Sequence, residues 1–165
     1  MQFSTSPLFR FSIVALGLAV SLAGTALAQP RDPSLGKWKL NVAKSTYEPG
    51  PVPKSEIRVY EVWEKDGVKA TITTVSADGT SSTRSYTAHY DGKDNAYLGT
   101  PDYDTVALTR VNATTIDATQ KKGKKVAATT HTVVSADGKT RTVTTTGVNA
   151  KKVKIHNVAV FDKQP

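Results

Sequence analysis

The stretch KKVAATTHTVVSADGKTRTVTTTGVNAKKVKIHNVAVFDK, residues 124–163, decides the fold class. It reads as three antiparallel strands: Lys124–Ser135, Lys139–Gly147 and Lys152–Asp162. These runs are rich in Val and Thr, whose branched side chains favour strands. The first two runs are joined by Asp137-Gly138, a strong hairpin signal because Gly supplies the positive φ that a tight turn needs. The stretch therefore predicts an antiparallel β-meander.

The same pattern extends upstream to the start of the domain. The further runs that we interpret as strands are Gly36–Leu40, Ser55–Glu64, Val68–Ser76, Thr80–Tyr90, a short one at Ala96–Gly99, Tyr103–Val111 and Thr114–Lys121. Closely spaced turn signals with short loops are typical of an up-and-down meander. Leu is scarce and no stretch has a helical apolar period, so the fold class is all-β, with nine or ten strands, and an α/β fold is excluded.

A meander of this length leaves two exposed edges unless it closes on itself. We therefore expect a closed, lipocalin-like barrel, with a β-sandwich as the alternative. The apolar phase switches within residues 57–62 and again within residues 153–160. We interpret each switch as a β-bulge or a tight corner of the barrel.

Residues 1–28 are predicted to be a secretory signal peptide. Arg10 precedes the apolar run Phe11–Leu22, and Ala26-Leu27-Ala28 forms a small-residue cleavage site. We expect export to a periplasm or the cell exterior after cleavage behind Ala28. The chain has no Cys, so neither a disulfide nor a thiolate ligand is available.

The exported chain is predicted to hold one domain. Residues 29–35 contain two prolines and read as a flexible lead-in, and residues 36–165 form a single barrel domain. The net charge of +8 falls to +7 when the signal peptide is removed. We expect a monomer.

The two ends of this domain resemble the lipocalin and fatty-acid-binding (calycin) barrels. Gly36-Lys37-Trp38 is similar to the Gly-x-Trp signature of the first strand in that family, and the run Asn157–Lys163 resembles the closing strand of fatty-acid-binding barrels. The resemblance implies that Trp38 plugs one end of the barrel. The layout also resembles small exported bacterial proteins of uncharacterised function.

The chain departs from this family in two places. Residues 42–54 contain three prolines and a glycine and have room for only one helical turn at Ala43–Tyr47, so the two lid helices of fatty-acid-binding proteins do not fit. Lipocalins carry an Arg on the last strand that covers the Trp, and the last strand here has none. Lys154 or Arg141 is available to cover Trp38 instead.

A closed barrel of about eight to ten strands has room for one small ligand. The aromatic candidates for its lumen are Trp38, Tyr60, Trp63, Tyr86 and Tyr90. The inward faces mix Thr, Ala, Val and Tyr, which leaves volume and places hydroxyl groups to orient a polar end of the ligand. We expect a small apolar or amphipathic molecule, such as a lipid, and no cofactor. The alternative is that the aromatic side chains fill a narrow core.

The sequence holds no motif for catalysis or metal binding. His89, His131 and His156 lie on three different strands with no acidic partner at metal-ligand spacing, so we expect them to face solvent. No Ser or Thr stands in a nucleophile motif. We predict that the protein is not an enzyme, with a hydrolase as the alternative.

Six lysines form a predicted basic rim: Lys121, Lys122, Lys124, Lys125, Lys151 and Lys152. Their two turns are separated by one other turn, so they fall at the same end of a meander. Such a rim suits an anionic membrane surface or polyanion, with salt-sensitive affinity, or serves only as solvated lysines that protect strand edges. Nucleic acid is not expected, because no aromatic residues interleave with the basic ones.

The sequence therefore predicts an exported, lipocalin-like protein that binds a small apolar or amphipathic ligand in the barrel lumen without catalysis. The alternative is a filled barrel that acts as an envelope interaction module through its basic rim.

Overall fold

The computed structural model describes residues 1–2 and 32–165. Apart from its first two residues, the predicted signal peptide lies outside the described part. The helical content of residues 32–165 is one 3₁₀ turn, η1 (Val42–Lys44). The strands are β1 (Gly36–Leu40), β2 (Thr46–Glu48), β3 (Ser55–Trp63), β4 (Gly67–Val75), β5 (Ser81–His89), β6 (Asn95–Leu98), β7 (Thr105–Arg110), β8 (Thr115–Lys122), β9 (Lys125–Val134), β10 (Thr140–Val148) and β11 (Lys154–Lys163).

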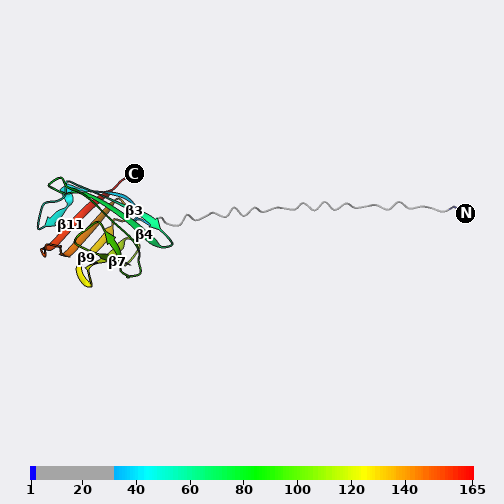
Figure 1. The fold of residues 1–165 in the computed structure, drawn as a ribbon. Coiled ribbons are helices and arrows are strands. Elements are labelled where there is room, and N and C mark those ends of the chain that lie inside the picture. The colour runs from blue at the N-terminus through cyan, green and yellow to red at the C-terminus, as the bar shows by residue number, and fades with distance from the viewer. Residues whose placement is uncertain (3–31) are drawn as a thin grey trace. The chain divides into compact units, whose positions relative to one another are not determined.

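All strands except β2 form a closed antiparallel ring in meander order. The ring closes where β1 pairs with β11, which aligns Trp38 with Lys163 and Leu40 with Phe161. In Figure 1 the strands curve around a common interior, with the red β11 beside the cyan beginning of the domain. The predicted closed barrel is confirmed and the sandwich is excluded.

The strand β2 is an addition to the ring that the sequence did not predict. It pairs with the N-terminal part of β11, next to the part that pairs with β1, and aligns Tyr47 with Asn157. The turn η1 separates β1 from β2, and the Ser45 hydroxyl bridges this break. It donates to the carbonyl of Asn41 at 2.7 Å and accepts from the amide of Val160 at 3.0 Å. The segment is thus a strand interrupted by one turn.

The inward face of β3 is polar, which changes how its sequence is interpreted. Pairing with β4 continues without a register break along the whole strand, so of the two alternatives for residues 57–62, a bulge or a tight corner, the bulge is wrong. The residues that face inward are Glu56, Arg58 and Tyr60, and the apolar residues between them face outward. β11 also pairs with β10 without a break. The register shift lies between β8 and β9, after Gln120.

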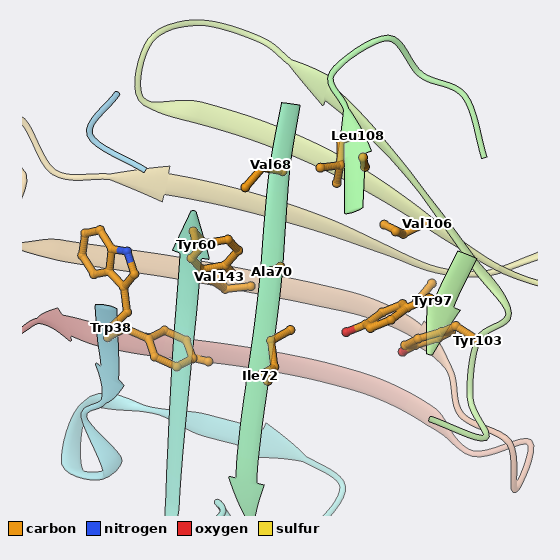
Figure 2. Close-up of a cluster of buried hydrophobic side chains, with 14 of the residues drawn as sticks. Trp38, Tyr60, Val68, Ala70, Ile72, Tyr97, Tyr103, Val106, Leu108 and Val143 are labelled. Carbon is orange, nitrogen blue, oxygen red and sulfur yellow. The ribbon is translucent and has the colours of Figure 1, made fainter. Parts of the chain in front are cut away.

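One end of the barrel is closed around Trp38, which is fully buried together with Phe161. Figure 2 shows Trp38 on one side of the apolar cluster and the rings of Tyr97 and Tyr103 on the opposite side. The cation above the Trp38 ring is Lys163 of the last strand, with Nζ 4.9 Å from the ring centroid.

Arg141 and Lys154, the two alternatives for the cation that covers Trp38, differ in their positions. The guanidinium carbon of Arg141 lies 5.9 Å from the Trp38 ring centroid, so Arg141 does flank the indole. Lys154 stands at the first position of β11, at the other end of the strand from Lys163. Of the two alternatives, Lys154 is therefore excluded.

The segment directly before β1 seals the same end. Ser34 is only 2% exposed, and its carbonyl accepts hydrogen bonds from Trp38 Nε1 at 3.2 Å and from Arg141 Nη1 at 3.1 Å. Asp32 is held by an ion pair with Arg110 at 2.6 Å. This part of the expected flexible lead-in is thus fixed to the barrel, because its polar groups find partners there.

Candidate functional site

The barrel encloses a cavity of about 170 Å³ with an unusual set of ionisable side chains around it. All the tyrosines of the chain line it: Tyr47, Tyr60, Tyr86, Tyr90, Tyr97 and Tyr103. The charged groups that line it are Arg58, Arg84, Arg141, Glu56 and Asp102. Three guanidinium groups thus face two carboxylates, so the lining carries one net positive charge. The sequence did not predict these arginines as lumen residues.

Strand geometry brings two of these arginines together. Inward positions alternate along β3, which places Arg58 two residues from Glu56 on the same face. Both Arg58 and Arg84 align with Ile72 of the intervening strand β4, so the two arginines stand at one level of the barrel. Between them, Glu56 accepts from Arg58 Nε at 2.6 Å and from Arg84 Nη2 at 3.0 Å.

Glu56 is the central acceptor of this group and is only 2% exposed. Its second oxygen also accepts from the hydroxyl of Thr74 at 2.7 Å. Burial acts to raise the pKa of Glu56, but the charges of Arg58 and Arg84 and the hydrogen bond from Thr74 outweigh it and lower the pKa below its ordinary value. The carboxylate is therefore ionised at neutral pH and compensates part of the arginine charge.

Arg141 enters the cavity from β10 and lacks such compensation. It is 4% exposed and forms no ion pair with any carboxylate of residues 32–165. Its Nη1 donates to the Ser34 carbonyl, while its buried Nε has no hydrogen-bond partner. Its guanidinium carbon lies 3.9 Å from the ring centroid of Tyr60, within the range of a cation–π contact. Arg84 Nε is also buried without a partner. The wall of the cavity therefore contains two buried guanidinium Nε groups without hydrogen-bond partners.

Aromatic rings form the side of the cavity towards β6 and β7. The rings of Tyr86 and Tyr97 meet edge to face at 5.2 Å, and those of Tyr97 and Tyr103 lie nearly parallel at 6.0 Å. Burial raises the pKa of all three phenols, to about 12 for Tyr103. These side chains are neutral at physiological pH and offer ring faces and hydroxyl groups.

The interior opens away from the Trp38 end. Along β10 the inward residues Arg141 and Val143 are buried, whereas Thr145 is half-buried. Along β11 Ala159 is buried, whereas Ile155 is half-buried. Along these two strands exposure rises towards the end that carries the β8–β9 and β10–β11 turns, and we interpret this end as the entrance.

No family model matches the chain, and no curated protein sequence matches it. The closed antiparallel barrel with its Trp-plugged end is consistent with a lipocalin-like fold, and no match to a known family adds to this.

The five lumen candidates do not share one environment. Tyr60, Tyr86 and Tyr90 line the cavity, as expected. Trp38 lies outside the lining, in the sealed end, and Trp63 packs at the end of β3 against the ring of His89, with ring centroids 5.1 Å apart. Three further tyrosines that line the cavity were missed. They belong to short strands and loops, and the sequence pattern did not show which side chains of these segments point inward.

The basic rim lies at the entrance. Its two turns fall at the same end of the barrel, as the meander order predicts. Lys121 and Lys122 pair with Asp94 at 2.8 Å and with Asp104 at 2.7 Å. The remaining four lysines of the rim, in the described part of the chain, form no ion pair. The rim is thus less positive than its sequence indicates.

The three histidines lie apart from the cavity. His131 and His156 are exposed, as predicted, and His89 is half-buried beside Glu64 at 3.3 Å. Within the described residues no group of three potential metal ligands is found. No helix in this part of the chain is long and apolar enough to span a membrane.

Proposed function

We propose that the protein is an exported, lipocalin-like binding protein that holds a small amphipathic molecule with one acidic group in its lumen, without catalysing a reaction. The apolar part of the ligand replaces water against the tyrosines and aliphatic side chains, and its acidic group meets the arginines. This refines the prediction of an apolar or amphipathic ligand, because the lumen carries charge that a purely apolar molecule would leave uncompensated.

The observation that carries the proposal is the environment of Arg141. Burying a cation without an anionic partner is unfavourable by several kcal/mol, even after local relaxation. Natural proteins retain such a destabilising group where function needs it. The uncompensated charge and the free Nε of Arg141 therefore suit an acceptor that arrives with the ligand. Guanidinium groups bind carboxylates through short, charge-assisted hydrogen bonds.

A thermal-shift experiment tests this function. We would measure the melting temperature with hexanoate and benzoate and with their neutral amides, since a ligand that binds only the folded state raises it. At least one of the two acids should raise the melting temperature more than its own amide does. The variant Arg141→Met should lose this response, while the rim variant Lys124→Met should keep it. No response to any acid, or an unchanged response in Arg141→Met, would exclude the proposed site.

A second candidate function uses the entrance end as an interaction surface. Four exposed apolar side chains lie there among the lysines: Leu98, Val126, Val148 and Val153. Apolar side chains beside lysines suit an anionic membrane surface. Vesicles containing phosphatidylglycerol should then bind the protein at low salt and release it at high salt. Equal binding to neutral vesicles, or no binding at low salt, would exclude this function.

A further inference from the structure

The size of the cavity restricts the ligand more sharply than its charge does. Pockets for drug-sized ligands measure about 300–1,000 Å³, and an apolar cavity of about 150 Å³ accommodates benzene. The lumen, at about 170 Å³, therefore has room for one six-membered ring with a small substituent. A long-chain fatty acid does not fit this volume.

The walls of the cavity favour a flat, aromatic ligand. Tyr86, Tyr97 and Tyr103 form a chain of edge-to-face and parallel ring contacts along one side. A further ring placed against them gains the same offset or edge-to-face contacts, which add to the burial of apolar area. An aliphatic chain of equal volume gains burial alone.

The charge of the lining indicates a monoanion. Glu56 is occupied by Arg58, Arg84 and Thr74, and the carboxylate of Asp102 accepts from the backbone amide of Ala150 at 2.8 Å. One net positive charge remains, and Arg141 is the guanidinium without a carboxylate. A single carboxylate neutralises this charge, whereas a dianionic phosphate ester would leave a negative charge in the cavity.

We infer that the ligand is a monocyclic aromatic carboxylic acid whose carboxylate pairs with Arg141 and whose ring packs against Tyr86 and Tyr97. This inference rests on the proposed function and narrows it to one chemical class. The Arg141 side is the sealed end, next to Ser34, so the carboxylate enters first and the ring follows from the entrance.

Isothermal titration calorimetry on the purified protein tests the inference. The ligands are benzoate, 4-hydroxybenzoate and trans-cinnamate, compared with hexanoate, benzamide and palmitate. At least one aromatic acid should bind about tenfold or more tightly than hexanoate, benzamide and palmitate do, which corresponds to about 1.4 kcal/mol. Arg141→Met should weaken aromatic-acid binding at least about tenfold, because it removes the charge-assisted hydrogen bonds.

Two further variants separate ring recognition from charge recognition. Tyr97→Leu should weaken the binding of the aromatic acids more than that of hexanoate, because Leu keeps apolar burial but lacks the ring contacts. Trp63→Leu, which removes an aromatic side chain outside the cavity lining, should leave the preference intact. If Tyr97→Leu fails to fold, Tyr86→Leu takes its place in the same comparison.

The negative results of these experiments distinguish a wrong ligand class from a wrong function. If hexanoate or palmitate binds as tightly as the aromatic acids and still requires Arg141, the aromatic class is wrong and the proposed function stands. If no acid binds, both the aromatic ligand class and the proposed function are wrong. If the amide binds as tightly as the acid, the carboxylate site at Arg141 is wrong.

Discussion

The guanidinium carbon of Arg141 lies 3.9 Å from the centre of the Tyr60 ring, inside a barrel whose other buried charges are paired. Burial acts to raise the pKa of the Tyr60 phenol, but the positive charges of Arg141 and Arg58 outweigh it and lower this pKa below its ordinary value. The pKa values of the other five tyrosines are raised. Tyr60 thus reports on the charge of the cavity.

A spectrophotometric titration of tyrosine ionisation should show this difference. One phenol should ionise below pH 10, and the remaining five should ionise above it, because their burial disfavours the phenolate. In Arg141→Met the early step should move to higher pH. A bound carboxylate should move it in the same direction, because it neutralises Arg141. If all six phenols ionise together near pH 10, the assigned environment of Tyr60 is wrong.

Replacing Arg141 separates binding from stability. Arg141→Met removes an unfavourable buried charge but also removes a cation–π contact of about 2 kcal/mol and a charged hydrogen bond of about 1.5–3 kcal/mol. These effects oppose each other, so the unfolding free energy should change by less than about 1 kcal/mol. Chemical denaturation measures this change. A loss of about 3 kcal/mol or more would show that Arg141 serves the fold rather than a ligand.

Replacing Glu56 should be strongly destabilising. Glu56→Gln leaves Arg58 and Arg84 without their carboxylate, and breaking a buried pair in this way costs about 3–5 kcal/mol. Urea denaturation at neutral pH checks the value. The variant Asp104→Asn, which removes an exposed carboxylate paired with Lys122, serves as the control and should change stability little. Equal effects of the two variants would contradict the account of the buried network.

Glu56 should also make stability depend on acid pH. Its folded pKa lies below the unfolded value of 4.5, so its contribution is complete above pH 4.5 and is lost as the pH falls through the folded pKa. The wild-type protein should therefore lose more stability than Glu56→Gln does when the pH is lowered from 5 into this range. If the stability of the two proteins falls in parallel as the pH is lowered, the pKa of Glu56 is not depressed.

Removing the plug should loosen the barrel. Trp38→Ala deletes a fully buried side chain and should reduce the unfolding free energy by about 3–5 kcal/mol. It also removes the indole donor to Ser34, so the sealing segment should become accessible to proteases. Limited proteolysis and thermal unfolding measure both effects. An unchanged melting temperature would contradict the role of Trp38 as a plug.

The fold was accessible from the sequence because its turns are strongly encoded. Asp-Gly turns lie between Val- and Thr-rich runs, and Gly79 and Gly138 adopt the positive φ that these turns require. The strand bounds were therefore predicted within a few residues. β2 was missed because it is short and gains its pairing from β11, far away in the sequence.

The site was less accessible because its inward residues are polar. Apolar alternation assigns the wrong face to β3, where Glu56, Arg58 and Tyr60 point inward and Ile57 and Val59 point outward. The useful signal was the alternation of charged residues at 56 and 58 with apolar neighbours, followed by an aromatic residue. Such a pattern indicates a polar lumen only once closure of the barrel is known. Arg141 likewise became informative only when its burial without a carboxylate was visible.

The central claim is that the lumen holds a small organic acid, and native mass spectrometry of the protein purified without refolding tests it most directly. We predict an additional discrete mass that is released by solvent extraction and is detected as a monocarboxylic acid, and that is lost in Arg141→Met. A bare protein mass, together with no uptake of benzoate or hexanoate by the purified protein, would contradict the claim.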